Sequence, residues 1–269
     1  MKETITSSAN PAIKALRKLQ EKKGRQESGC FYVEGLKLVG DALEKGADIC
    51  QIIYSSDLLV SDFGRKIPQL AEKRRIETLN VTPDVFNSFS MKAGPQGAAA
   101  VVRQHWLALD DSGAEHGLWL ALENVQDPGN LGSALRSLDG AGGSGLILLD
   151  DATDAYHPTA VRASMGSIFT QKLVKTDTGA LADWKKRRGA RIIGTWCGEA
   201  KAYRSYNYPE DMILLMGSEQ KGLQPQHLAL CDELVHIPMR GYVDSLNLAC
   251  AASVVLFEIF DQREKNKEK

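Results

Sequence analysis

The stretch at positions 237–252, with the letters IPMRGYVDSLNLACAA, constrains the fold of this chain more than any other part. An apolar, strand-like run leads into it, a turn with a proline and a glycine follows, and the pattern predicts a long apolar helix from about Asp244 to Gln262. Such a turn holds polar side chains over a helix start. Ser245 and Asn247 are types that cap free helix amides or face a ligand there, and for Asp244 or Ser245 alone an N-cap is the simpler role.

Two earlier stretches have the same character. Positions 123–136 read ENVQDPGNLGSALR and positions 214–223 read LLMGSEQKGL, and each comes at the end of an apolar, strand-like run. In open α/β sheets, ligands bind at the carboxyl ends of the strands. We therefore expect the three polar, glycine-rich turns to meet at one ligand site.

The C-terminal half alternates apolar strands with helices. The predicted strands are Leu118–Leu122, Leu146–Leu149, Ile168–Val174, Arg191–Trp196, Met212–Met216 and Leu234–Ile237. The predicted helices are Leu131–Asp139, Thr159–Met165, Ala180–Arg187, Pro225–Leu230 and Ser245–Gln262. Near-continuous apolar strands between helices are typical of a mostly parallel α/β sheet that is covered on both faces.

The first hundred residues predict a smaller α/β domain of their own. A helix is expected to begin after Asn10, with Pro11 at its first position. Strands are expected at 31–35, 49–54 and 97–102, with helical patterns between them.

A chain of 269 residues exceeds the usual size of a single domain, so two domains are expected. The segment 106–117 is rich in charge and turn formers, and we take it as a linker between domains at 1–105 and 118–269. Lys and Arg outnumber Asp and Glu by 16 to 12 in residues 1–103, a net charge of +4, and are outnumbered by 17 to 22 in the rest, a net charge of -5. The N-terminal domain is therefore the better platform for a polyanion.

Several classes of protein are not favoured by the sequence. The cysteines lack metal-ligand spacing, so we expect reduced thiols, no metal and a cytoplasmic location; they are Cys30, Cys50, Cys197, Cys231 and Cys250. No apolar run reaches the roughly 18 residues of a membrane helix, so we expect no membrane partner. Positions 140–145 fit the letters GxGxxG, but they follow a helix and precede a strand, the reverse of a dinucleotide site.

The three turns together resemble the motifs of the SpoU branch of the SPOUT superfamily of RNA methyltransferases. The resemblance rests on DPGNLGSALR at 127–136, GSEQKG at 217–222 and IPMRGYVDSLN at 237–247. It implies a catalytic domain with a C-terminal trefoil knot, S-adenosylmethionine as cofactor, and a homodimer with shared active sites. The N-terminal part is similar to the ribosomal-protein-like RNA-binding domain that precedes many such catalytic domains.

The resemblance also implies which side chains form the site. The implied catalytic residues are Asn130, Arg136, Glu219, Ser245 and Asn247, and the implied cofactor-binding residues are Gly217, Ile237, Met239 and Leu246. Gln220 replaces a glycine that is common in the second motif. Because a guanidinium stays protonated in proteins, we expect Arg136 to hold a substrate phosphate and orient the hydroxyl instead of acting as a base.

The reaction expected from this resemblance is transfer of a methyl group from S-adenosylmethionine to a ribose 2′-hydroxyl of RNA. Ribosomal RNA is the expected substrate and transfer RNA is the nearer alternative. A non-catalytic RNA-binding or assembly protein is the alternative from another class, although the intact set of motif residues weighs against it.

Overall fold

The computed structural model describes residues 4–267, which divide into two compact units. The N-terminal unit contains the described residues up to Gln104 together with Tyr156–Phe169, a stretch that we expected in the C-terminal domain. The C-terminal unit contains the remainder. Its beginning includes the expected linker, in which the Leu107 amide donates to the Leu173 carbonyl over 2.9 Å.

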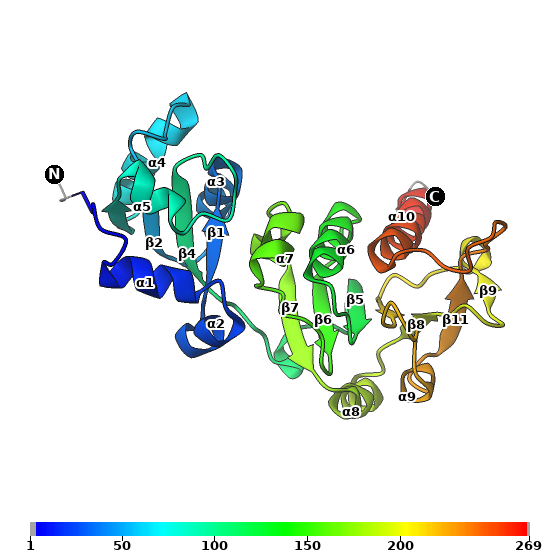
Figure 1. Cartoon of the computed structure of the whole chain (residues 1–269). Helices are drawn as coiled ribbons and strands as arrows, with labels where there is room; N and C mark the ends of the chain where they lie inside the picture. Colours follow the sequence, from blue (N-terminus) through cyan, green and yellow to red (C-terminus); the bar gives the residue numbers. More distant parts are fainter. Residues whose placement is uncertain (1–3, 268–269) are drawn as a thin grey trace. The chain divides into compact units, whose positions relative to one another are not determined.

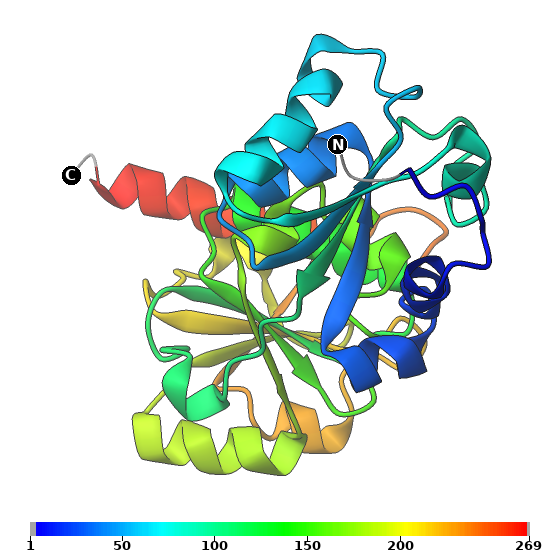
Figure 2. The same ribbon diagram turned by 90° about the vertical axis from the view of Figure 1, so that its left-hand side faces the viewer.

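The N-terminal unit is built on a mixed four-stranded sheet in the order β1-β4-β2-β3. Its strands are β1 Cys30–Glu34, β2 Ile49–Tyr54, β3 Glu77–Asn80 and β4 Ala98–Arg103, with β4 antiparallel to both neighbours and β2 parallel to β3. Its helices are α1 Pro11–Lys18, α2 Lys22–Ser28, α3 Leu36–Glu44, α4 Asp62–Lys73, α5 Pro83–Asn87 and α7 Pro158–Ala163, followed by the 3-10 turn η2 Ser167–Phe169 (Figures 1 and 2).

One face of this sheet carries the apolar core formed with α1 and α5. Ile13 and Leu16 from α1 pack with Phe86 from α5 and with Tyr32 from β1. Helix α1 begins where the sequence predicts, because Asn10 Oδ1 accepts from the second amide of the helix over 2.9 Å and a proline occupies the first position.

The C-terminal unit contains a seven-stranded sheet in the order β7-β6-β5-β10-β8-β11-β9, in which every paired strand is parallel. Its strands are β5 Leu118–Glu123, β6 Gly145–Leu149, β7 Lys172–Thr176, β8 Ile192–Thr195, β9 Lys201–Ala202, β10 Met212–Met216 and β11 Glu233–His236. Its helices are α6 Pro128–Gly140, α8 Thr178–Arg188, α9 Pro225–Leu228 and α10 Leu248–Lys267, with 3-10 turns η1 Leu109–Asp111 and η3 Tyr203–Ser205. The predicted parallel α/β sheet is confirmed.

Helices cover both faces of this sheet (Figure 1). On one face, Trp119 from β5 packs in a core with Leu181 and Trp184 from α8. On the other face lie α6 and α10, whose Ser137 and Ser253 hydroxyls are 2.7 Å apart. Among residues 4–267 there is no helix with the length and apolarity that crossing a bilayer requires.

Three sequence predictions about elements need correction. The strand expected from Ile168 begins only at Lys172, because residues 167–169 form η2 and belong to the N-terminal unit. Strand β3 and the two-residue β9 were not predicted, since each is short and weakly apolar. The last helix begins at Leu248 rather than near Asp244.

Candidate active site

The three motif loops follow β5, β10 and β11 at the carboxyl edge of the parallel sheet. The first loop leads into α6 and the third leads into α10, two helices that pack side by side. This placement brings residues more than a hundred positions apart in the sequence to one edge, as expected for ligand sites in open α/β sheets.

Asn130 is the centre of a side-chain network at this edge. The Asp127 carboxylate caps α6 and fixes the turn by accepting from the Asn130 amide over 2.7 Å. The Asn130 side chain donates from Nδ2 to Glu219 Oε1 over 2.9 Å, and its Oδ1 accepts from Asn247 Nδ2, also over 2.9 Å. One asparagine thus joins the loops after β5, β10 and β11.

Asn247 has a second role at the start of α10. Its Oδ1 accepts from the amides of Ala249 and Cys250 over 2.9 and 3.3 Å, so this asparagine caps the helix. The prediction of Asp244 or Ser245 as the cap is wrong: the Ser245 hydroxyl donates to the Asp244 carboxylate over 3.1 Å, and neither contacts the helix amides. The structure therefore places Ser245 outside the Asn130 network.

The loop after β10 is held from two sides. Glu123, at the end of β5, is only 4% exposed, and its Oε2 accepts from the Ser218 amide over 3.2 Å. The loop then folds back, with the Gly222 amide donating to the Ser218 carbonyl. A Cβ on Gly217 would lie 2.1 Å from the carbonyl carbon of Gly222 and 2.2 Å from the nitrogen of Leu223. Glycine is required at 217 because the loop crosses itself there.

The loop after β11 is open. Within the described chain, no backbone hydrogen bond outside helices and strands involves residues 237–246. Tyr242 is fully exposed, Leu246 is 39% exposed, and Ile237 and Met239 are half-buried. The main-chain amides and carbonyls of this loop are available to a ligand, which fits the expectation that Ile237, Met239 and Leu246 bind a cofactor through the backbone.

Arg136 lies apart from the Asn130 network. It is exposed on α6, and within residues 4–267 its side chain makes neither an ion pair nor a hydrogen bond. Six residues separate it from Asn130, which turns its side chain about 120° away around the helix. One turn further, a Cβ on Gly140 would lie 3.5 Å from the Phe257 ring of α10. Arg136 therefore shares a surface with exposed Phe257 and its neighbour Phe260.

A second polar cluster is not predicted by the sequence. Asp150, which follows β6, accepts from the amide and hydroxyl of Thr178 over 3.0 and 2.6 Å, and buried His227 lies 3.2 Å from the same carboxylate. Burial acts to raise the pKa of Asp150, but the Thr178 and His227 hydrogen bonds outweigh it and hold the pKa below its ordinary value.

This cluster also bears on metal binding. Glu123, Asp150 and His227 place ligand atoms within 4.8 Å of one another, so the three could hold a cation. One ligand atom of each is already engaged: Glu123 Oε2 by the Ser218 amide, and Asp150 Oδ2 and His227 Nε2 by the Thr178 hydroxyl. No local pattern indicates this cluster, since its members are scattered and only Glu123, a charged residue ending an apolar strand, belongs to a motif.

Known proteins match both units. The model of the SpoU rRNA Methylase family matches residues 117–257, and the model of the MRM3-like substrate binding domain matches residues 10–100. The AdoMet-bound rRNA methyltransferase from Sinorhizobium meliloti superposes with a TM-score of 0.87 and 34% identity, covering 98% of each chain.

Curated relatives agree with these matches. The 23S rRNA (uridine(2479)-2'-O)-methyltransferase of Streptomyces viridochromogenes is 32% identical over 254 residues, which cover 91% of this chain and 87% of the relative. The 23S rRNA (guanosine(2553)-2'-O)-methyltransferase RlmP of Bacillus subtilis is 29% identical, covering 95% of this chain and 98% of the relative. The chain is therefore a methyltransferase that belongs to the SpoU rRNA methylase family.

Proposed function

We propose that this enzyme transfers a methyl group from S-adenosylmethionine to a ribose 2′-hydroxyl of RNA, and that its substrate is 23S ribosomal RNA. The observation that carries the proposal is the network of Asn130, Glu219 and Asn247, which ties the three motif loops together at the ligand-binding edge of the sheet. The curated relatives support both the class of RNA and the oxygen that is methylated, since the two relatives are named as 23S rRNA 2'-O-methyltransferases. Transfer RNA remains the alternative substrate.

The open loops after β10 and β11 supply the groups that would hold the cofactor. Gly217 keeps the first loop tightly folded, and Ile237, Met239 and Leu246 leave main-chain groups free in the second. S-adenosylmethionine supplies a methyl group that is activated by a sulfonium sulfur. The protein must therefore hold the hydroxyl oxygen in line with that carbon, on the side opposite the sulfur.

Each predicted catalytic side chain has a role that its position supports. Asn130, held by Asn247, would fix Glu219 beside the cofactor loop. Ser245 lies in the open loop after β11 and would line the cofactor site at the motif loops. Arg136 would bind the substrate phosphate through its planar fork and orient the hydroxyl, with the proton passing to the phosphate or to water.

The exposed position of Arg136 supports a homodimer in which this arginine serves the partner's site. Phe257 and Phe260 are 48% and 38% exposed on the same surface, with ring centroids 6.2 Å apart. Two exposed aromatic rings beside a free guanidinium are typical of an interface core. A two-fold dimer buries this surface on both protomers.

The strand order supports the trefoil knot. Strands β10 and β8 separate β11 from β5, yet α10 returns to pack beside α6, the helix that follows β5. The chain after β11 must therefore cross back past the loop of β10.

The domain assignment also belongs to this proposal. Residues 1–105 would bind the RNA, 106–117 would connect, and 118–269 would carry out methyl transfer, except that 156–169 belongs to the N-terminal unit and would join the RNA-binding part. The match to the MRM3-like substrate binding domain and the net positive charge of the N-terminal part support this division. The ribosomal RNA substrates of the relatives support a cytoplasmic location.

Asn130→Asp is expected to lower turnover at least about tenfold at neutral pH. The substitution keeps the acceptor for Asn247 but replaces the donor to Glu219 by a carboxylate oxygen, and two carboxylates at this distance repel. Turnover should recover partly at lower pH, where one proton can bridge the pair. The control is Gln220→Glu, which adds a charge at an exposed residue, next to Glu219, that makes no hydrogen bond with Asn130. Equal pH profiles for the two variants would contradict the role of the network.

The function is tested by incubating the protein with labelled S-adenosylmethionine and unmodified 23S ribosomal RNA, with transfer RNA as the parallel substrate. We expect label in the ribosomal RNA, in an alkali-resistant dinucleotide, because a 2′-O-methyl group blocks cleavage at that position. Label in the base would contradict ribose methylation, and label only in transfer RNA would favour the alternative substrate. Ribose-methylation mapping in cells with and without the gene would then identify the nucleotide.

A further inference from the structure

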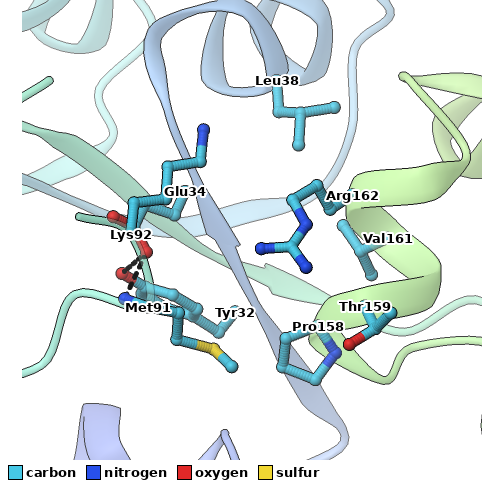
Figure 3. Close-up of a pocket in the computed structure, with 9 residues that line it drawn as sticks. All are labelled: Tyr32, Glu34, Leu38, Met91, Lys92, Pro158, Thr159, Val161 and Arg162. Carbon is cyan, nitrogen blue, oxygen red and sulfur yellow. Dashed lines mark hydrogen bonds between the residues drawn. The ribbon is translucent and has the colours of Figure 1, made fainter. Parts of the chain in front are cut away.

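A small pocket lies in the N-terminal unit, away from the motif loops. Its walls come from β1, α3, the segment before β4 and α7 (Figure 3). The lining residues are Tyr32, Glu34, Leu38, Met91, Lys92, Pro158, Thr159, Val161 and Arg162. The pocket has an accessible volume of about 30 Å³, and a single water needs roughly 10–15 Å³ by the same measure, so the pocket has room for a small group.

Two cations face this space. The Arg162 guanidinium points into the pocket from α7, and the Lys92 side chain rises beside Glu34 (Figure 3). Within residues 4–267 neither side chain has an ion pair or a hydrogen bond. Gly35, with φ of 106°, keeps room for the lysine, because a Cβ there would lie 2.8 Å from Lys92 Nζ.

The carboxylate in the pocket does not neutralise these cations by direct pairing. Glu34 is only 7% exposed and accepts from the Tyr32 hydroxyl over 3.0 Å, from the Met91 amide over 2.9 Å and from the Ser90 hydroxyl. Burial, reinforced by the Glu34 charge, raises the pKa of Tyr32, so the phenol stays a donor. With Glu34 satisfied by these donors, one negative and two positive charges leave the pocket with a net charge of +1.

We propose that this pocket binds a phosphodiester group of the RNA substrate between Lys92 and Arg162, an inference that rests on the proposed function. A phosphate matches the pocket in size and in sign, and the guanidinium can bind two of its oxygens in parallel. Lys92 lies in the segment before β4 and Arg162 lies in α7, far apart in the sequence. The bound phosphate would therefore also link these two segments.

The test is the double variant Lys92→Gln with Arg162→Gln, titrated with a fragment of 23S ribosomal RNA that the unaltered protein methylates. We expect affinity to fall about tenfold and the slope of log affinity against log salt to shrink by roughly 0.7, since one phosphate charge is no longer neutralised. S-adenosylmethionine affinity should be unchanged. The matched control is Lys66→Gln with Arg75→Gln, which removes the same charges from exposed positions of the same unit outside the pocket.

Equal losses of RNA affinity in the pocket and control variants would overturn the proposed phosphate site, because such losses would reflect overall charge alone. Binding of inorganic phosphate that disappears in the double variant while RNA affinity stays normal would assign the site to the free anion and also overturn it. Arg162→Lys, which keeps the charge and removes the fork, should lose affinity by an intermediate factor and serves if the double variant unfolds. Absence of any methyl transfer by the unaltered protein contradicts the proposed function instead.

Discussion

Arg136→Ala is expected to lower turnover by about a hundredfold to a thousandfold while leaving S-adenosylmethionine affinity within about twofold. The reason is its position: Arg136 is exposed and unpaired within the described residues, outside the network that shapes the cofactor loops. Arg136→Lys should restore little, because an ammonium cannot reproduce the planar fork. Steady-state rates with saturating RNA, together with calorimetric cofactor binding, measure the two effects separately.

Mixing two inactive proteins tests whether Arg136 acts across a dimer. Arg136→Ala and Asn130→Ala protomers should each be inactive alone, since each dimer then lacks the same group in both sites. Random exchange gives half mixed dimers, each with one intact composite site, so about a quarter of the full activity should return. If no activity returned after verified exchange, Arg136 and Asn130 of the same protomer would act in one site, and the shared site would be wrong.

Gly217→Ala is expected to abolish S-adenosylmethionine binding, with at least about a hundredfold loss of affinity, and to lower the free energy of unfolding by about 1–3 kcal/mol. The added methyl group would lie 2.1 and 2.2 Å from backbone atoms of Gly222 and Leu223, so the loop after β10 must open. Calorimetric titration and denaturant unfolding measure both effects.

Gly241→Ala is the matched control in the loop after β11. A Cβ at Gly241 meets nothing within 4 Å, and this residue does not have positive φ. Near-normal cofactor affinity is therefore expected. If Gly217→Ala bound the cofactor as well as Gly241→Ala does, the crossing of the loop at 217 would not be needed for the site.

The sequence predicts the C-terminal sheet well because its strands are apolar on both faces. Met212–Met216 has the predicted bounds, and the ends of the other long strands differ by few residues. The resemblance also implied that Asn130, Glu219 and Asn247 belong to one site, and hydrogen bonds join the three side chains. These features depend on local pattern and on the rule that parallel strands share a carboxyl edge.

Other features depend on contacts that no local pattern encodes. The stretch 156–169 reads as a helix and the start of a strand, yet it packs with the N-terminal unit, where Tyr156 and Phe169 both face Phe31. The cap of the last helix was misplaced because Asp244, Ser245 and Asn247 are all good capping types, and only the packing of α10 against α6 selects the third.

Because Asn247 both caps α10 and binds Asn130, the amide protons at the start of α10 report whether the three motif loops are held together. Its Oδ1 shields the amides of Ala249 and Cys250, while its Nδ2 is held by Asn130, which also holds Glu219. Fraying of the first turn of α10 and separation of the three loops are thus one opening event. Exchange of these two amide hydrogens with solvent would follow the fraction of molecules whose loops are assembled, and a ligand that bridges the loops would slow it.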